Sequence, residues 1–360
     1  MKRSKKNFEN AHILIIGSGI IGKFNALELS KQGFKITIAD PQKKKNSSTA
    51  ALGLLIGNMY QKSKGRSWEL RKKSNELWPK WIKFLKQYNN YLHIEKPLIQ
   101  LTTEQKKFEK LSQFISHHPD RGLRVLERDS TIIQNINKIF NMDNLKGIIS
   151  NEDGRIDPIT LLKTLNICLK DEKVNFIKDK IIKVKKLNNQ WISTCSNKLE
   201  IKSDVIILCN SLDALKLIDL NIHNIKLKPV LGQAIEISLN KEEINLLRLP
   251  KHFSIDGTNF IRTNENKIII GSTDEYNIEP KENTFEELTD FLENKPKWLN
   301  KNNISDKWFG IRSRPEGEPS PILKSLEKGL ILCTGFYKNG ILLAPACSNW
   351  ISKEIENHLL

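Results

Sequence analysis

The order of apolar and polar residues predicts alternating strands and helices from the start of the chain. Residues 12–16 form a short apolar run that is typical of a buried strand. Residues 23–32 place apolar side chains at helical spacing, Gly33 ends that pattern, and residues 34–39 form a second apolar run. A strand, a helix and another strand within about 30 residues make a β-α-β unit, which predicts a parallel sheet.

The pattern further along the chain indicates more elements of both kinds. Helical periodicity recurs at 62–90, 103–117 and 284–293, and a last helix closes the chain. Another helix is expected to begin at Asp157 and Pro158, because these residues suit an N-cap and a first helical turn. Strand-like runs are predicted at 174–177, 181–187, 191–195, 199–209, 230–239, 259–273 and 329–334.

These elements predict two interleaved parts of the chain. A length of 360 residues exceeds the usual size of one domain and suggests about two. The runs at 199–209 and 329–334 are expected to complete the sheet that the first two strands begin. The segments between them would then build a second domain from strands and helices.

The turn after the first strand carries candidate chemistry. Gly17, Gly19 and Gly22 form the pattern G-x-G-x-x-G between a strand and a helix, and Asp40 ends the second strand. The glycines would let a pyrophosphate approach the backbone, and the helix N-terminus would attract its negative charge. Asp40 would accept hydrogen bonds from the adenosine ribose and would disfavour the 2′-phosphate of NADP. The motif therefore predicts a bound dinucleotide, either FAD or NAD.

Composition narrows the class of protein. A hydrophobic fraction of 39% and a charged fraction of 28% are ordinary for a folded, soluble protein. No apolar run approaches the ~20 residues that span a bilayer, and the basic N-terminus lacks a cleavage site, so we expect a cytoplasmic protein. We expect neither a metal site nor a disulfide, because the cysteines are widely spaced and form no C-x-x-C pair. The cysteines are Cys168, Cys195, Cys209, Cys333 and Cys347.

The chain is strongly basic. Fifty-eight Lys and Arg residues against 41 Asp and Glu residues give a formal net charge of +17, which favours anionic partners or substrates. The basic residues are scattered, however, and many fall on helical segments. Aromatic residues do not cluster with them as a stacking platform for nucleic acid would need. We therefore interpret them as solvated helix faces and expect no specific nucleic-acid partner.

The segment after the second strand distinguishes FAD from NAD. Ser47-Ser48-Thr49-Ala50-Ala51-Leu52-Gly53-Leu54 resembles the S-x-A-A-x-G stretch of the D-amino acid oxidase and glycine oxidase superfamily, whose members bind FAD. Further motifs similar to those of the family follow in the same order: G-R-I-D-P from Gly154, K-P-V-L-G-Q from Lys228, G-S-T-D-E from Gly271, W-F-G-I-R from Trp308 and G-F-Y-K-N-G-I-L-L-A-P from Gly335. From residue 12 to residue 347 the chain thus resembles a glycine oxidase of the thiamine-biosynthesis type.

This resemblance implies a fold and a cofactor. The fold is α/β, with a Rossmann-like FAD-binding domain (1–60, 145–215 and 320–360) interleaved with an antiparallel-sheet, α+β substrate domain (61–144 and 216–319). The FAD should be non-covalent, because Ile269 replaces the lysine of monomeric sarcosine oxidases and no cysteine between Cys209 and Cys333 could bond the flavin. The residues implied for FAD binding are Gly17, Gly19, Ile20, Ile21, Gly22, Asp40, Ser48, Thr49, Ala50, Gly53, Ile181, Gly335, Asn339, Gly340, Ile341 and Leu342.

The resemblance also implies residues around the substrate. Arg312 holds the position that binds the substrate carboxylate, which suits the planar fork of a guanidinium. Lys338 lies where a second basic residue is common, and Asn259 replaces the active-site tyrosine of the family. The segment after Arg312 is shorter than in the family and brings Arg314 near the site. These departures leave the identity of the substrate open.

The expected function is FAD-dependent oxidation of a small amino acid or amine. Molecular oxygen would accept the electrons, and the products would be an imine or 2-oxo acid, ammonia and hydrogen peroxide. Two alternatives stay open: a dehydrogenase that passes electrons to a quinone, and a flavoprotein that acts on a modified transfer RNA base. The sequence also leaves open whether the protein forms a homo-oligomer.

Overall fold

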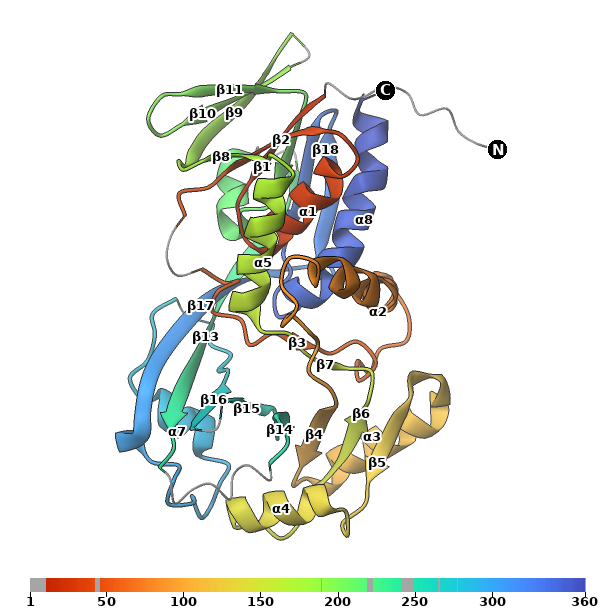
Figure 1. Ribbon diagram of the computed structural model, residues 1–360, viewed down its shortest axis with the longest axis vertical. Coiled ribbons are helices and arrows are strands. Elements are labelled where there is room, and N and C mark those ends of the chain that lie inside the picture. The colour runs from red at the N-terminus through yellow and green to blue at the C-terminus, as the bar shows by residue number, and fades with distance from the viewer. Residues whose placement is uncertain are drawn as a thin grey trace.

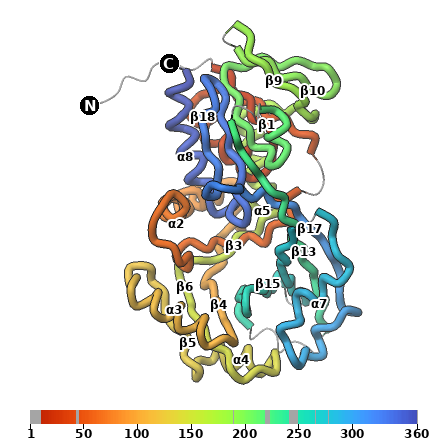
Figure 2. Tube along the Cα trace, turned by 180° about the vertical axis from the view of Figure 1, so that it is seen from behind, coloured from red at the N-terminus to blue at the C-terminus, as the bar shows by residue number. Residues whose placement is uncertain are grey.

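The chain folds around two large sheets that lie in different halves of the molecule (Figures 1 and 2). The computed structural model describes residues 11–42, 46–188, 190–218, 223–240, 249–264, 266–276 and 278–359. Each half contains segments from distant parts of the sequence, because the chain passes between them repeatedly. The expected α/β architecture, with a parallel sheet and an antiparallel sheet, is confirmed.

The first sheet has six strands, and β1 is one of its central strands. In spatial order the strands are β18 (Ile322–Glu327), β19 (Leu330–Thr334), β12 (Val205–Leu208), β1 (His12–Ile16), β2 (Lys35–Ala39) and β8 (Asn175–Ile177). All neighbours are parallel except β18 and β19. The helix α1 (Ile20–Ser30) joins β1 to β2, and β12 and β19 complete the sheet as predicted.

Both faces of this sheet are buried. Successive side chains along a strand point to opposite faces, so alternate residues of β1 pack into two different cores. Ile13 and Ile15 face a core that they share with α1, α2 (Arg66–Leu85), α5 (Pro158–Asp171) and α8 (Gly340–Leu359). Leu14 and Ile16 face a small antiparallel sheet of β9 (Ile181–Leu187), β10 (Gln190–Cys195) and β11 (Glu200–Ser203).

The predicted strand at 199–209 is wrong in one respect, because it is two strands in different sheets. Asp204 separates β11 from β12. Its backbone N–H donates to the carbonyl of His12 at 2.8 Å, and its carboxylate accepts the N–H of His12 at 2.8 Å. These bonds fasten the turn to β1 and direct the chain from the small sheet into the parallel one.

The second sheet has eight strands and is antiparallel except where β14 pairs with β4. In spatial order they are β17 (Ile304–Pro315), β13 (Leu227–Ser238), β16 (Lys267–Gly271), β15 (Thr258–Asn264), β14 (His252–Ile255), β4 (Leu98–Thr102), β6 (Lys146–Ser150) and β5 (Leu123–Leu126). Its core is shared with α4 (Thr131–Phe140) and α7 (Thr284–Thr289), and α3 (Gln105–His117) packs near β5 and β6. Between the halves, β3 (Leu54–Leu55) pairs with β7 (Gly154–Arg155).

Several predicted boundaries differ from those observed. The run 259–273 is a hairpin of β15 and β16, the helix predicted at 284–293 ends at Thr289, and α1 begins at Ile20 because the glycine turn leads directly into it. The segment 43–48, whose polar residues predict a loop, lies partly outside the described residues. The sequence pattern did not indicate helix α4 or strands such as β4, β5 and β6. The strands were missed because runs of four or five residues alternate too briefly to stand out.

Helix α2 packs against α8, within the core of the parallel sheet. The domain boundaries expected from the sequence stay a prediction. Within the described residues, no helix combines the length and the apolar character needed to cross a bilayer.

Candidate active site

A cavity of about 790 Å³ lies where the two halves meet, and both halves supply its lining. Gly19 and Ile20 reach it from the glycine turn, and Ser48 reaches it from the loop after β2. From the other half, Arg312 on β17 and Ser272 after β16 line it. Some candidate cofactor residues and some candidate substrate residues therefore line the same cavity.

The glycine turn is built so that no side chain blocks it. Gly17 has a φ of 108°, and a Cβ there would lie 2.8 Å from the backbone carbonyl of Cys209. A Cβ on Gly22 would collide with the carbonyl oxygen of Gly17. Gly19 caps α1 without any side-chain hydrogen bond, and the N–H of Ile20 donates to Ser48 Oγ at 2.9 Å. The positive end of α1 thus borders the cavity directly.

Asp40 closes the turn from the end of β2. Its carboxylate accepts the backbone N–H of Ser18 at 2.8 Å and that of Gln42 at 2.6 Å. Each carboxylate oxygen keeps capacity for a further donor, because an ionised carboxylate accepts about four hydrogen bonds. This environment fits contact with ribose hydroxyls.

The small-residue loop after β2 is held against β17 by the motif around Trp308. Trp308 Nε1 donates to the carbonyl of Ala50 at 3.2 Å, and Ser47 Oγ donates to the carbonyl of Ile311 at 2.8 Å. A Cβ on Gly310 would lie 2.7 Å from Cβ of Ala50, so only glycine permits this approach. The two sequence motifs are therefore one structural unit.

A second pair of motifs meets on the other side of the same loop. Gly53 has a φ of 85°, and a Cβ there would collide with the carbonyl oxygen of Ile156. Its own carbonyl accepts the N–H of Ile156 at 3.0 Å. This contact fixes the path of the loop along the cavity.

These features fit FAD. The turn leaves backbone open to a pyrophosphate, the N-cap residue Gly19 has no side chain, and the loop after β2 lines the cavity mostly with small side chains. Of the residues expected around FAD, those that line the cavity are Gly19, Ile20, Ile21, Ser48, Ala50, Gly53, Asn339, Gly340 and Ile341.

The remaining expected residues lie outside the cavity lining: Gly17, Gly22, Asp40, Thr49, Ile181, Gly335 and Leu342. The hydroxyl of Thr49 bonds the carbonyl of Asn46 at 3.0 Å, so it stabilises the loop. Ile181 is buried in the core beneath the small antiparallel sheet. Gly335 has a φ of 70° and packs against Pro315. The carbonyl of Leu342 accepts Nε1–H of Trp78 at 3.0 Å.

Arg312 extends from β17 and is held on one side by the protein. Nη1 donates to the carbonyl of Thr273 at 3.1 Å and lies 3.3 Å from Asp274 Oδ1, and Nη2 donates to Ser272 Oγ at 2.6 Å. Gly232 on β13 provides the space, because a Cβ there would collide with the guanidinium. Burial lowers the pKa of Arg312, and the charge of Asp274 opposes that effect.

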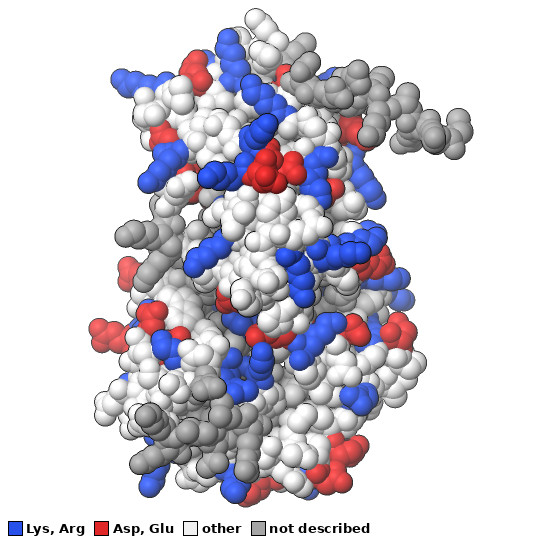
Figure 3. Space-filling view, viewed as in Figure 1, with Lys and Arg blue, Asp and Glu red and all other residues white. Residues whose placement is uncertain are grey.

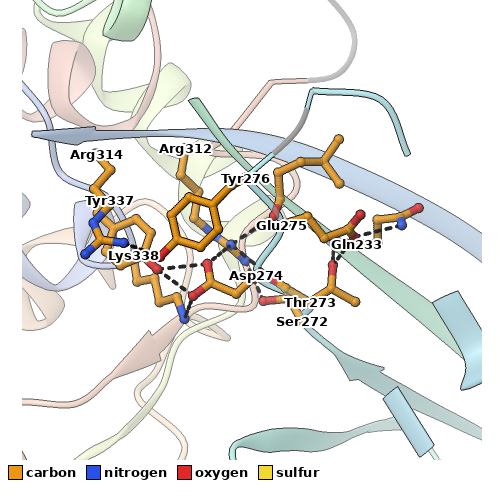
Figure 4. Close-up of polar contacts among 11 residues, drawn as sticks. Gln233, Ser272, Thr273, Asp274, Glu275, Tyr276, Arg312, Arg314, Tyr337 and Lys338 are labelled. Atoms are coloured by element: carbon orange, nitrogen blue, oxygen red, sulfur yellow. Dashed lines mark hydrogen bonds and ion pairs between the residues drawn. The ribbon is translucent and has the colours of Figure 1, made fainter. Parts of the chain in front are cut away.

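Asp274 is the centre of the polar network beside Arg312 (Figure 4). Its carboxylate accepts the hydroxyl of Tyr337 at 2.8 and 2.6 Å and lies 2.9 Å from Nζ of Lys338. Burial favours the neutral acid, but hydrogen bonds from Tyr337 and Lys338, and the charges of Lys338 and Arg312, lower the pKa of Asp274 overall. Burial and the bond to Asp274 raise the pKa of Tyr337, which therefore stays protonated.

The other expected substrate residues are also close to this network. Lys338 and Asn259 both line the cavity. Asn259 Nδ2 donates to the carbonyl of Gly271 at 2.8 Å, so this donor is directed at the backbone. Arg314 lies over the rings of Tyr276 and Tyr337, with centroid distances of 5.6 and 5.3 Å, and does not line the cavity.

Sequence reasoning missed three polar residues of the site. Asp274 lies within the G-S-T-D-E motif and Tyr337 directly precedes Lys338 in the last motif, but the motif resemblance assigned a role to neither. Arg71 on α2 lines the cavity and donates to Asn339 Oδ1 at 2.8 Å. An arginine at a buried position of an amphipathic helix was the available signal for Arg71.

One face of the molecule shows charged side chains of both signs. On the face drawn in Figure 3, Lys and Arg side chains are spread over both halves, with Asp and Glu between them. Within the described residues, no group of His, Cys, Asp and Glu is arranged to hold a metal ion. The cavity points to function because candidate residues from both halves line it.

Comparison with known protein families assigns the chain to one of them. The model of the family described as FAD dependent oxidoreductase (DAO) matches residues 12–354. The chain belongs to this family. It is therefore an FAD-dependent oxidoreductase, as the glycine turn and the small-residue loop indicated.

Curated relatives of this oxidoreductase are distant. The bifunctional protein ThiO/ThiG of Synechocystis sp. is 23% identical over 347 residues, which are 94% of this chain and 51% of that protein. The protein of the same name from a Nostoc species is 24% identical over 349 residues, which are 92% of this chain and 51% of that protein. The chain thus spans about half the length of these relatives.

Solved structures confirm the fold. Glycine oxidase from Bacillus cereus superposes with a TM-score of 0.81 at 20% identity, covering 96% of this chain and 95% of that one. Iminodiacetate oxidase from Chelativorans sp. gives a TM-score of 0.80 at 17% identity, with 96% and 95% covered. L-proline dehydrogenase from P. horikoshii gives 0.76 at 17% identity, with 96% and 94% covered.

Proposed function

We propose that this oxidoreductase removes a hydride from the carbon beside the amine of a small amino acid. The imine so formed hydrolyses to a 2-oxo acid and ammonia, and molecular oxygen is reduced to hydrogen peroxide. The observation that carries the proposal is the guanidinium of Arg312 on the wall of the cavity that the glycine turn and Ser48 also line. A cation there suits a substrate with a carboxylate, and an amine without one is the second candidate.

Non-covalent FAD would be held by the turn at Gly19, the N-terminus of α1 and the loop from Ser48 to Gly53. When bound, FAD supplies the acceptor for the hydride, which is the step that side chains cannot perform. The chain must then bind and orient the substrate. Orientation in a defined site is a large part of what a protein contributes to such a reaction.

Arg312 would bind the substrate carboxylate. Ser272 and the carbonyl of Thr273 hold its guanidinium, so the cation is positioned before the substrate arrives. Tyr337 and Lys338 border the same part of the cavity. Among the described residues of the lining there is no histidine, so we propose that the substrate binds with its amine already neutral.

Glycine is the first substrate to test. Its support comes from the motif order of the sequence and from the relatives named ThiO/ThiG. Oxidation of glycine would give an imine that hydrolyses to glyoxylate, or that a thiazole-forming reaction could use in thiamine biosynthesis. Because Asn259 stands where the family has a tyrosine, other small amino acids and secondary amines belong in the same screen.

The decisive experiment is amino acid turnover by purified, FAD-loaded protein. Peroxide formation is measured beside the reduction of an artificial dye, and the flavin is released by denaturation to check that it is non-covalent. Peroxide at a rate matching 2-oxo acid formation would support an oxidase, whereas turnover with the dye alone would favour the dehydrogenase alternative. A protein that cannot be loaded with FAD would exclude the whole proposal.

Binding of transfer RNA tests the alternative that the protein acts on a modified transfer RNA base. If the basic surface is only solvated, binding should weaken steeply as salt increases, as non-specific phosphate contacts do. Tight binding at physiological salt that discriminates among RNAs would favour a flavoprotein of RNA modification instead.

A further inference from the structure

A carboxylate of the protein itself contacts two cations of the cavity wall, although Asp274 does not line the cavity. Arg312 Nη1 lies 3.3 Å from Asp274 Oδ1, and Lys338 Nζ lies 2.9 Å from Asp274 Oδ2. Arg312 comes from β17, and Lys338 comes from the segment before α8. Two cations from separate elements therefore share one anion where both of them line the cavity (Figure 4).

Asp274 is fixed in this position and ionised. The hydroxyl of Tyr337 donates to both of its carboxylate oxygens, at 2.8 and 2.6 Å. Tyr337 has a φ of 52°, in the left-handed region that large side chains rarely adopt, and its N–H donates to the carbonyl of Ser313 at 3.0 Å. The surrounding structure thus maintains an unfavourable backbone conformation that keeps this hydroxyl on Asp274.

Arg312 can accept a second carboxylate without releasing Asp274. A guanidinium carries five N–H donors. Nη1 donates to the carbonyl of Thr273 and faces Asp274, while Nη2 gives one hydrogen to Ser272. The other Nη2 hydrogen and Nε–H have no acceptor among the described residues, so the guanidinium keeps two donors for a carboxylate of the substrate.

We propose that Asp274 is a specificity-determining residue, a built-in second carboxylate that makes the site select substrates with a single carboxylate. The inference rests on the proposed function, because it takes Arg312 as the anchor of the substrate. Arg312, Lys338 and Asp274 together carry one net positive charge, which one substrate carboxylate balances. Without Asp274 the two cations would match a substrate with two carboxylates.

The test measures selectivity among simple anions. Acetate, malonate and succinate are titrated into FAD-loaded protein, and binding is followed by the change in flavin absorbance. In Asp274→Asn, which keeps the shape but removes the charge, we expect malonate or succinate to gain at least tenfold in affinity relative to acetate. Across an amino acid screen, the same variant should shift kcat/KM towards aspartate and glutamate.

Two further variants separate charge from structure. Asp306→Asn removes the same charge from the same strand as Arg312, six residues away and so about 20 Å along a strand. It should leave the ratio of malonate to acetate affinity unchanged. Asp274→Asn combined with Lys338→Met restores one net positive charge and should return the ratio to near its original value.

The outcomes are distinct. If Asp274→Asn tightens all anions equally, or changes no affinity, the inference is wrong while the proposed function stands. If the unaltered holoprotein binds none of these anions and oxidises no amino acid, the proposed function itself fails. If Asp274→Asn does not load FAD, Lys338→Met alone decides: it must lower malonate affinity several-fold more than acetate affinity, and equal losses would overturn the inference.

Discussion

At the scale of single residues, the position of Arg312 depends on neighbouring glycines, which have no side chain. Gly232 leaves the volume that the guanidinium occupies, and Gly310 lets the small-residue loop reach β17. Ser272 and Thr273 then fix two of the guanidinium nitrogens. A charged group held by such bonds needs little rearrangement when a carboxylate binds, which lowers the cost of ordering it.

Substitution of Arg312 should separate orientation from charge. Arg312→Lys keeps the charge but loses the fork, so kcat/KM for the best amino acid should fall by on the order of 10–100-fold, because a hydrogen bond to a charged group contributes ~1.5–3 kcal/mol. Arg312→Leu should cost more, and FAD content should stay constant in both. Full activity of Arg312→Leu would show that the arginine is structural and that the anchor lies elsewhere.

Gly232→Ala tests the same geometry without changing any polar group. A methyl group at this position would collide with the guanidinium, so Arg312 must shift away from Ser272. We expect kcat/KM to fall by roughly the same 10–100-fold as in Arg312→Lys, since the same oriented contact is lost. FAD content and melting temperature serve as controls. Unchanged kinetics in a folded, FAD-loaded variant would mean that the guanidinium position is not critical.

At the scale of elements, α1 is almost fully buried and contains a lysine on its packed face. Lys23 is 7% exposed, and its Nζ donates to Asn166 on α5 at 2.6 Å. Burial lowers the pKa of Lys23 to about 8, against the opposing charge of Asp40. The helix thus contains an ionised group that the folded state disfavours near neutral pH.

Lys23→Met should therefore stabilise the protein, and the gain should depend on pH. Because the pKa of Lys23 is lower in the folded than in the unfolded state, its contribution to stability rises with pH from about 8 to 10.5. We expect a gain of about 1–3 kcal/mol at pH 7 that shrinks towards pH 10, measured by urea unfolding. The exposed Lys163 on α5 provides the control, and a loss of stability in Lys23→Met at both pH values would refute the argument.

At the scale of the whole molecule, residues from both halves line the same cavity. Gly19 and Gly340 line it from the nucleotide half, while Asn259 and Arg312 line it from the other. A ligand that contacts both halves stabilises the folded state in proportion to its affinity, because it binds only when both are in place. Bound FAD should therefore contribute a large part of the free energy of unfolding of this chain.

Flavins of different length should reveal whether the glycine turn contributes to cofactor binding. FAD added to cofactor-free protein at about 100 times its Kd should contribute ~2.7 kcal/mol and raise the melting temperature. FMN lacks the adenosine and one phosphate, so it should give a smaller shift, and Gly19→Val should abolish the difference between the two. Equal shifts with FAD and FMN in the unaltered protein would argue against a dinucleotide at the glycine turn.

Local sequence determined the glycine turn and the elements on either side of it. The strand, the glycine turn, α1, β2 and Asp40 are contiguous, so apolar periodicity and the backbone requirements of glycine specify them through near neighbours. The order of the motifs then indicated the family and the position of Arg312. The turn and the elements on either side of it are encoded in one short contiguous segment, which is why the sequence alone was sufficient to predict them.

Tertiary structure decided the substrate half. Asp274 meets Arg312 across 38 positions and Tyr337 across 63, and these pairs form only when β13, β16 and β17 align in register. Long-range pairing in the other sheets likewise divided the run 199–209 between two of them, and the pairing of β15 with β16 brought the amide of Asn259 to the carbonyl of Gly271. Charge balance and hydrogen bonding depend on distances in space, and no local pattern of residues encodes those distances.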